Sequence, residues 1–268
     1  MPTRLIICGA AGRMGRMVIQ LASQQPDASI TGAIEFRQHP AIGQDAGSVA
    51  GVDTLGVPIS HEYATLAAPD TVTIDFTNAE SALAHLRVAV EQQAAIVIGS
   101  TGFSDEQRRE LDDLAPRTRS VVAANMSIGV AVLQRLIREA ALALADDFDM
   151  EIVEMHHRMK VDSPSGTALA LAETLADASG RQLADTAVYG REGIVGKRTR
   201  DEIGILALRG GDVVGDHTVI FAGSGERLEL THRAQSRDCL ARGAVRAALW
   251  LSTQPVGRYT IADVLGWG

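Results

Sequence analysis

The chain has 268 residues, 46% of them hydrophobic, which is enough to bury the core of one large domain or of two modest ones. Aromatic residues make up only 4% and the formal net charge is -8 at pH 7, so a protein that binds nucleic acid or an anionic membrane surface is disfavoured. With Cys8 and Cys239 as the only cysteines, we expect neither a disulfide framework nor a cysteine-based metal site, as is typical of a cytoplasmic protein.

From residue 4 to about residue 125, short apolar runs alternate with longer segments of helical periodicity. The apolar runs that we predict to be strands are 4–8, 30–35, 71–76, 94–99 and 120–125. The periodic segments that we predict to be helices are 15–25, 79–93 and 104–115. Strands that alternate with helices indicate an α/β fold, here a Rossmann-type parallel sheet covered on both faces.

After residue 127 the pattern changes. Helices are predicted at 128–145, 165–178 and 238–255, and strands at 148–157, 202–211, 216–223 and 226–234. The last three strands read as antiparallel, so we expect an α+β domain with an open mixed or antiparallel sheet. Because Arg135, Arg138 and Glu139 interrupt the first helix, we expect it in a core and not in a membrane.

These patterns divide the chain into three segments. We expect the Rossmann-type domain over residues 1–127, the α+β domain over 128–238, and a C-terminal segment, 239–268, that returns to the first domain. The boundary falls in the stretch AANMSIG, where Gly129 offers a hinge.

A glycine turn, CGAAGRMG, links the first predicted strand to the first helix. Gly9, Gly12 and Gly15 would let the backbone approach a pyrophosphate at the helix N-terminus, although Ala11 stands where a second glycine is usual. By itself the turn could be an ordinary strand-to-helix loop. Glu35 ends the second strand about 20 residues further on, where a ribose-binding acid is expected. The combination favours a dinucleotide site, and the strand ends GSTG and AANM would also pass the cofactor or be plain turns.

A second motif, EMHHRMKVDSPSGTAL, gathers positive charge in front of a helix. His156 and His157 point to opposite faces if they are extended, and Lys160 follows the strand end. Gly166 and Thr167 open the helix, whose free N–H groups can bind an anion. This set suits a substrate with carboxylates, because lysine can donate a proton and histidine can act as an acid or stabilise charge.

Plainer interpretations exist for each of these residues taken singly. A histidine pair is often surface or satisfied core, a lysine is usually solvated, and DSPSGT could be only a well-capped helix start. The whole set, after a dinucleotide domain, favours a substrate site. A zinc site is a further interpretation, but no third or fourth ligand has suitable spacing, so no metal is predicted.

Five stretches carry a resemblance to a known family: GAAGRMG, GSTGF, AANMSIGV, EMHHRMKVDSPSGTA and RGGDVVGDHTVIFAGSGERLELTHRA. Together they resemble the 4-hydroxy-tetrahydrodipicolinate reductase (dihydrodipicolinate reductase) family over nearly the whole chain. The resemblance implies reduction of 4-hydroxy-tetrahydrodipicolinate, via dihydrodipicolinate, to tetrahydrodipicolinate in the diaminopimelate and lysine pathway. It also implies NADH and/or NADPH as cofactor, a small dicarboxylate substrate, and a homotetramer formed through the open sheet.

The resemblance further implies roles for individual residues. His156 and Lys160 would be catalytic, while His157, Gly166 and Thr167 would bind substrate. The residues that would line the cofactor are Gly9, Ala10, Ala11, Gly12, Arg13, Met14, Glu35, Gly99, Ser100, Thr101, Ala123, Ala124, Asn125 and Met126.

The choice between NADH and NADPH depends on the residues near Glu35. An acid there binds the ribose hydroxyls and repels a 2′-phosphate unless an arginine compensates. NADPH-competent relatives often have an arginine directly after the acid, whereas this chain has Phe36, and Arg37 would point to the other side of an extended segment. We predict dual use with NADH at least as good as NADPH, and Arg13 leaves the preference open.

Two other functions fit parts of the sequence. A non-catalytic dinucleotide sensor would keep the glycine turn and Glu35 but would have no use for the histidine–lysine motif. Another Rossmann dehydrogenase of a small carboxylate would keep a catalytic lysine or histidine, but the order HHRMKVDSPSGT argues against it.

Overall fold

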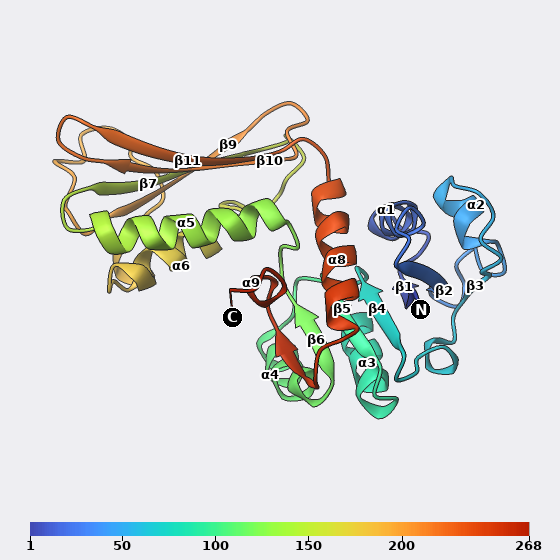
Figure 1. Ribbon diagram of the computed structural model, residues 1–268. Coiled ribbons are helices and arrows are strands. Elements are labelled where there is room, and N and C mark those ends of the chain that lie inside the picture. The colour runs from blue at the N-terminus through green and yellow to red at the C-terminus, as the bar shows by residue number, and fades with distance from the viewer. Residues whose placement is uncertain (268) are drawn as a thin grey trace. The chain divides into compact units, whose positions relative to one another are not determined.

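The computed structural model describes residues 1–267 and forms two compact units (Figure 1). Unit 1 consists of Met1–Ile128 and the chain from Asp238 onward, and unit 2 is Gly129–Arg237. Within the described residues, none of the helices has both the length and the apolar character that crossing a membrane requires.

Unit 1 contains a seven-stranded sheet whose pairings are all parallel, in the order β12-β6-β5-β4-β1-β2-β3. Its strands are β1 (Thr3–Cys8), β2 (Ala28–Ile34), β3 (Ile59–Ser60), β4 (Thr71–Asp75), β5 (Ala95–Ile98), β6 (Arg119–Val122) and β12 (Gly257–Tyr259). Its helices are α1 (Arg13–Ala22), α2 (Ala46–Ala50), α3 (Ala79–Glu91), α4 (Asp105–Leu114), α8 (Asp238–Leu251) and α9 (Ile261–Val264), with short 3-10 turns at Tyr63–Thr65 and Ala115–Arg117.

The central strands of unit 1 are apolar along their whole length because helices cover both faces of the sheet. Every residue of β4 and β5 is buried, and Ile96 and Ile98 pack with Leu83 and Leu86 of α3 in one core cluster. The strand order reverses between β1 and β4, which is the place where open parallel sheets bind ligands. The predicted parallel α/β sheet is confirmed.

Unit 2 contains a five-stranded sheet in the order β11-β10-β7-β9-β8. Its strands are β7 (Asp149–His156), β8 (Ala187–Val188), β9 (Ile203–Arg209), β10 (Gly215–Ala222) and β11 (Arg227–Ala234), and its helices are α5 (Ile128–Leu144), α6 (Gly166–Ala178) and α7 (Leu183–Thr186). β10 runs antiparallel to β7 and β11, but β9 runs parallel to β7. The sheet is therefore mixed, one of the two predicted alternatives. The parallel pair forms because a helical crossover through α6 separates β9 from β7.

The two faces of this sheet differ. Figure 1 shows α5 and α6 along one face. Met150 and Ile152 of β7 point to that face and join a core cluster with Leu171 of α6. The same alternation buries Glu154 and His156 further along β7, so one face of the strand changes from apolar to polar towards its end.

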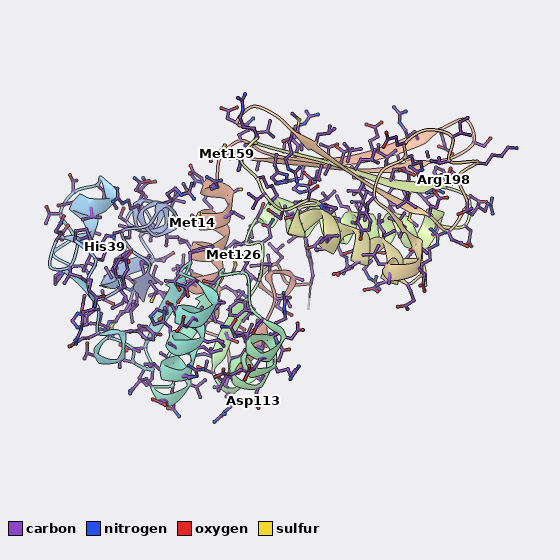
Figure 2. The ribbon with its side chains drawn as sticks, turned by 180° about the vertical axis from the view of Figure 1, so that it is seen from behind. Met14, His39, Asp113, Met126, Met159 and Arg198 are labelled. Carbon is purple, nitrogen blue, oxygen red and sulfur yellow. The ribbon has the colours of Figure 1, made fainter. Side chains whose placement is uncertain are left out.

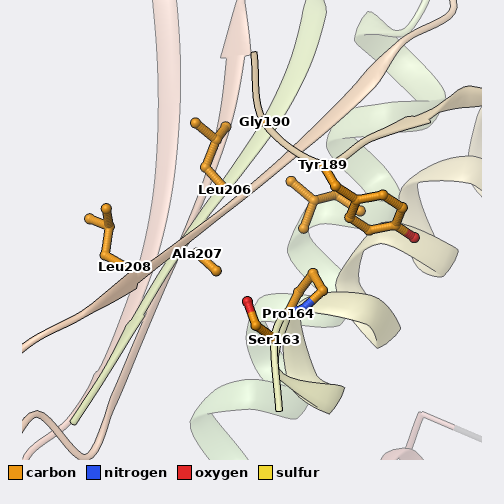
Figure 3. Close-up of a pocket in the computed structure, with 8 residues that line it drawn as sticks. Ser163, Pro164, Tyr189, Gly190, Leu206, Ala207 and Leu208 are labelled. Carbon is orange, nitrogen blue, oxygen red and sulfur yellow. The ribbon is translucent and has the colours of Figure 1, made fainter. Parts of the chain in front are cut away.

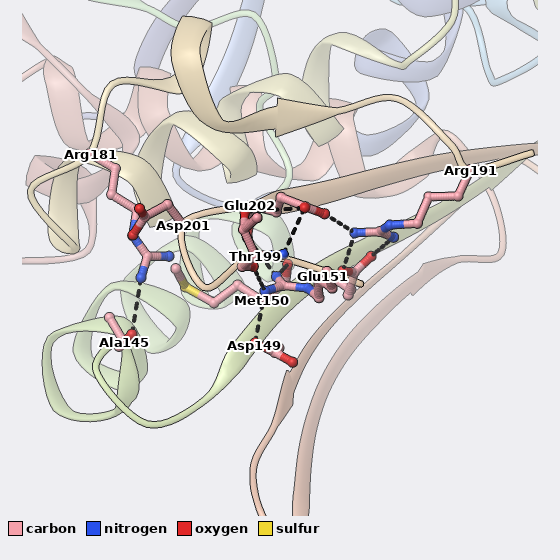
Figure 4. A network of polar contacts seen from close by, with 10 residues as sticks. Ala145, Asp149, Met150, Glu151, Arg181, Arg191, Thr199, Asp201 and Glu202 are labelled. Atoms are coloured by element: carbon pink, nitrogen blue, oxygen red, sulfur yellow. Dashed lines mark hydrogen bonds and ion pairs between the residues drawn. The ribbon is translucent and has the colours of Figure 1, made fainter. Parts of the chain in front are cut away.

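A long loop between β8 and β9 is tied to β7 by arginines (Figure 4). Arg191 contacts Glu151 and Glu202, each at 2.9 Å, and Arg198 contacts Asp149 at 2.7 Å and Glu151 at 3.0 Å. Arg198 and Met159 lie at opposite ends of unit 2 (Figure 2), so this network is remote from the residues that follow β7.

Candidate active site

The glycine turn after β1 has a geometry that requires glycine at two positions. Gly9 has φ +72°, in the left-handed region that side chains disfavour. A Cβ on Gly15 would lie 2.0 Å from the carbonyl oxygen of Gly9, so a larger residue would push α1 away from the turn. Ala10 and Ala11 between them are buried. The turn therefore packs α1 directly against the end of β1.

The N-terminus of α1 offers backbone donors. Gly12 is its N-cap and makes no side-chain hydrogen bond to the helix, whereas Asn78 caps α3 by accepting from Ser81 N at 3.0 Å. The first N–H groups of a helix, here at Arg13 and Met14, have no acceptor within the helix itself (Met14 is labelled in Figure 2). This end of α1 is suited to an anion.

Glu35 lies against the glycine turn, where a ribose-binding acid is predicted. Its Oε1 accepts a hydrogen bond from Ala11 N at 2.9 Å. The next side chain, Phe36, is 62% exposed and meets His39 edge-on at a ring-centroid distance of 5.1 Å. Arg37 is exposed as well. A carboxylate and an aromatic ring thus occupy the rim beside the turn.

The ends of β5 and β6 lie at the same edge of the sheet. Gly99 is required by packing, because a Cβ there would lie 2.2 Å from the Phe76 ring. Ser100 is buried and Thr101 is exposed. After β6, Ala124 is exposed, while Ala123 and Asn125 are partly buried and Met126 is buried (Met126 is labelled in Figure 2). Parallel pairing brings these predicted cofactor residues to one edge with the glycine turn.

Asp75 also lies at these strand ends, although no sequence motif predicted it. It ends β4, is fully buried, and accepts from Thr77 N (2.9 Å), Thr77 Oγ1 (2.6 Å), Ser100 Oγ (3.1 Å) and His85 Nδ1 (2.6 Å). Burial alone raises the pKa of Asp75, but the hydrogen bonds from His85 and Thr77 outweigh it and leave the pKa below its usual value. An acid at the end of an apolar strand was the available signal.

Asp75 and His85 also approach Cys8, and the possible ligand atoms of the three lie within 4.8 Å of one another. Both oxygens of Asp75 already accept hydrogen bonds. Burial, with the charges of Asp75 and Glu35, raises the pKa of the Cys8 thiol well above its usual value and disfavours the thiolate that binds metals. These contacts describe a hydrogen-bonded core cluster.

In unit 2, His156 belongs to a buried polar cluster around Glu154. His156 Nδ1 lies 2.6 Å from Glu154 Oε2, and Arg209 of β9 contacts both carboxylate oxygens at 2.8 and 2.9 Å. Glu154 Oε1 also accepts from Ser165 N, the N-cap of α6, at 3.0 Å. Burial alone raises the pKa of Glu154, but the hydrogen bonds from Arg209 and His156 outweigh it and keep the pKa below its usual value.

His217 of β10 is a second histidine in this cluster. Its ring lies edge-on to that of His156 at 5.2 Å, and its Nε2 is 3.0 Å from Ser165 Oγ. Burial, and then the charge of His156, lower the pKa of His217 to about 4, so it is neutral at physiological pH. The alternation of DHTVIFA, which buries every second residue, was the signal for it.

Lys160 and His157 lie in the turn after β7. Lys160 Nζ is 2.8 Å from both oxygens of Asp162, and its hydrogen bond lowers the pKa of Asp162. His157 N donates to Val213 O at 2.7 Å, while its buried Nδ1 has no partner among residues 1–267. The structure thus joins His156 to α6 through Glu154, but it records no hydrogen bond between Lys160 and His156.

The N-terminus of α6 is the third part of the predicted substrate site. Ser165 Oγ caps the helix by accepting from Ala168 N at 3.1 Å. Gly166 is exposed, and a Cβ there would meet no atom within 4 Å. Thr167 follows in the first turn and is partly buried. This helix end can receive a carboxylate.

A cavity of about 510 Å³ lies beside the segment that precedes α6 (Figure 3). Its walls are Ser163, Pro164, Tyr189, Gly190 and the stretch from Ile205 to Leu208. Its lining contains neither His156 nor Lys160, and it lacks cationic groups. Because a dicarboxylate requires charged partners, the helix end with the histidines is the better candidate.

Comparison with known protein families covers both units. The model of the dihydrodipicolinate reductase N-terminus matches residues 3–126, and that of the dihydrodipicolinate reductase C-terminus matches residues 129–265. The 4-hydroxy-tetrahydrodipicolinate reductases of Pelobacter propionicus and Geotalea uraniireducens are 48% and 49% identical to the chain over 263 residues, which is 98% of this chain and of each relative.

Solved structures show the same arrangement of elements. A dipicolinate-bound dihydrodipicolinate reductase from Paenisporosarcina matches with a TM-score of 0.77 and 23% identity, over 98% of this chain and 99% of that one. An amine dehydrogenase from Mycobacterium smegmatis gives a TM-score of 0.59 and 18% identity, over 97% of this chain and 95% of that one. At these identities the likeness concerns the fold.

Proposed function

This chain belongs to the dihydrodipicolinate reductase family and has 4-hydroxy-tetrahydrodipicolinate reductase activity, a step of lysine biosynthesis, and from that premise we propose its cofactor and its working residues. The observation that carries the activity is that both units match models of this family. The match is therefore not confined to one unit of the chain. The substrate is accordingly a small dicarboxylate.

Unit 1 is the proposed binding site for NADH or NADPH. The uncapped N-terminus of α1 would hold the pyrophosphate, and Glu35, fixed by Ala11 N, would bind the ribose hydroxyls. The segments Gly99–Thr101 and Ala123–Met126 would line the rest of the cofactor. When bound, the reduced nicotinamide supplies the hydride.

NADH is proposed to serve at least as well as NADPH. The carboxylate of Glu35 would repel a 2′-phosphate, and exposed Phe36 offers no charge to compensate. Arg13 and Arg37 are exposed and would supply the positive charge that lets NADPH bind too.

The proposed substrate site lies in unit 2. One carboxylate of the substrate would bind the N-terminus of α6 at Gly166 and Thr167, with His157 as a further contact. His156 would stabilise the charge that develops on the substrate or act as its acid, through Nε2. Lys160 Nζ would donate the proton that the reduced ring requires, after leaving Asp162, its partner in the free protein.

Lysine substitution tests these roles. With substrate generated in situ from pyruvate and aspartate semialdehyde by a coupled synthase, oxidation of NADH and of NADPH is followed by absorbance. Lys160→Ala is expected to lower kcat by about 100-fold or more while cofactor binding stays intact. Lys197→Ala, at the exposed loop lysine, is the matched control. Normal turnover by Lys160→Ala would refute the proton-donor role.

The protein is further proposed to work as a homotetramer in the cytoplasm. The sheet face opposite α5 and α6 carries partly exposed Val153 and Leu206 and 51% exposed Leu208, an apolar surface that self-association would bury. Sedimentation analysis of the wild type and of Leu208→Glu tests this: we expect a tetramer that the added charge dissociates, and a monomeric wild type would contradict it.

A further inference from the structure

Glu154 holds two parts of the proposed substrate site at once. We infer that Glu154 is a positioning residue of the reductase reaction: its carboxylate fixes His156 with Nε2 as the nitrogen available to substrate, and it anchors the N-terminus of α6 to the same point. The inference rests on the proposed function, because it concerns how His156 and α6 are held in that site.

The Glu154 carboxylate is held in its ionised form by its partners. The side chain is fully buried, yet its two oxygens accept two hydrogen bonds from Arg209, one from His156 and one from Ser165 N. The bidentate pair with Arg209 supplies a full positive charge, and the pKa of Glu154 is lowered. Glu154 is therefore ionised at neutral pH and can only accept hydrogen bonds.

An acceptor at 2.6 Å determines the tautomer of His156. Because Glu154 has no proton to donate, the hydrogen of a neutral His156 must be on Nδ1. Nε2 then carries the lone pair, or the second proton when the ring is charged. Among the described residues Nε2 has no hydrogen-bond partner, and it is not one of the buried polar atoms that lack a partner. It is the nitrogen left for substrate.

Gly215 leaves room for that side of the ring. A Cβ on Gly215 would lie 2.9 Å from His156 Nε2, so a side chain there would displace the ring or cover its reactive nitrogen. Gly215 begins β10, the strand that also carries His217. The ring of His156 is thus held by Glu154 on one side and kept open on the other.

The same carboxylate sets the position of α6. Ser165 N donates to Glu154 Oε1, and Ser165 Oγ caps α6 and contacts His217 Nε2. The Glu154 carboxylate therefore holds both the helix end that would bind a substrate carboxylate and the histidine, His156, that would contact the substrate ring. Fixing both ends of a bound substrate in this way reduces the entropy lost on reaching the transition state.

The charged and titratable groups around His156 determine in which direction Glu154→Gln shifts the pH dependence of turnover. Glu154 on its own strand is negative, Arg209 on β9 is positive, and neutral His217 faces it from β10, with His232 beyond on β11 and Lys160 in the following turn. Glu154→Gln removes the negative charge and so destabilises the protonated form of His156 relative to the neutral form. It also allows the amide to donate to Nδ1, so the tautomer of the neutral ring is no longer fixed.

The experiment is steady-state kinetics of Glu154→Gln across pH. We expect kcat to fall about 10- to 100-fold, the size typical when the group orienting a histidine is removed. Because only the charged ring can act as an acid or stabilise negative charge through Nε2, the basic limb of the pH–rate profile should move to lower pH, while KM for NADH is unchanged. Glu110→Gln, which breaks an exposed bidentate pair with Arg87, is the matched control and should leave both kcat and the profile unchanged.

Glu154→Gln leaves Arg209 without its partner, so instability is tested separately. The double variant Glu154→Gln/Arg209→Gln removes both charges and relieves the unpaired one. We expect kcat to stay low in the double variant. Wild-type kcat and pH profile in either folded variant would overturn the inference, because Glu154 would then serve only to balance charge.

His156→Ala, measured in parallel, separates the two proposals. Unchanged turnover by His156→Ala would refute the proposed catalytic site itself. Lost turnover in His156→Ala with normal turnover in Glu154→Gln would refute only the positioning role.

Discussion

The two units bury a carboxylate each, and the two are held differently. Asp75 of unit 1 is surrounded by hydroxyl and backbone donors and by one histidine, His85. Glu154 of unit 2 has a bidentate arginine as well as a histidine. The first carboxylate binds the loops after β4 and β5, and the second binds His156, the proposed catalytic histidine. From this difference we expect substitution of Asp75 to affect cofactor binding and substitution of Glu154 to affect turnover.

The largest expected effect comes from removing the arginine that distinguishes the two. Arg209→Met leaves the fully buried Glu154 carboxylate without its main counter-charge, and we expect a loss of about 3 kcal/mol or more in the free energy of unfolding. Urea unfolding measures it. Arg87→Met, which breaks the exposed pair with Glu110, should cost less than about 1 kcal/mol. Equal losses would show that burial of the pair has no consequence.

Acid sharpens the contrast, because only the Glu154 cluster contains a strongly shifted histidine. The pKa of His217 is about 4 when folded, against about 6.5 for an unfolded histidine. Its contribution to stability is therefore complete above pH 6.5 and is lost as the pH falls towards 4, by about 3 kcal/mol. The lowered pKa values of Asp75 and Glu154 place their own losses at lower pH. Unfolding measurements on the wild type and on His217→Phe across this pH range check the prediction. If the free energies of unfolding of the two proteins fall equally with pH, the prediction is wrong.

Asp75→Asn addresses the other side of the comparison. The amide cannot accept from His85 and Ser100 as the carboxylate does, so the loops after β4 and β5 lose a shared anchor. We expect KM for NADH to rise about 10-fold with kcat at saturating NADH nearly unchanged. Asp70→Asn, at an exposed acid paired with Arg4, is the control. A fall in kcat without a change in KM would reverse the roles assigned to the two carboxylates.

Phe36→Arg should give the smallest effect, because it acts at an exposed position. A guanidinium beside Glu35 would offer a 2′-phosphate one partner, worth about 1 kcal/mol or about fivefold in the ratio of kcat/KM for NADPH over NADH. Phe36→Leu controls for loss of the ring. If Phe36→Arg leaves the ratio where it was, position 36 does not set the preference.

Much of the fold could be predicted because its strands are continuous apolar runs. The fully buried β4 and β5 were found in this way, whereas β3 and β12, with two and three residues, are too short to show a period. The direction of β9 depends on pairing with β7, some 50 residues earlier, and local patterns carry no information about such a partner.

The candidate site divides in the same manner. Gly9, Glu35 and the segment around Lys160 could be proposed from the sequence because contiguous motifs mark them. Arg209 was missed because its contact with Glu154 spans 55 residues. Glu154 itself could have been found, since it lies two residues before His156 on the same face of a predicted strand.

The return of the chain to unit 1 has a consequence for synthesis. β12 supplies the edge strand beside β6, and α8 packs against α1, β4 and β5. A Cβ on Gly243 of α8 would lie 1.7 Å from the carbonyl oxygen of Met126, so the helix fits tightly against a proposed cofactor segment. The ribosome therefore makes all of unit 2 before it makes α8 and β12, and the packing of unit 1 around the proposed cofactor segment can be completed only after both have been made.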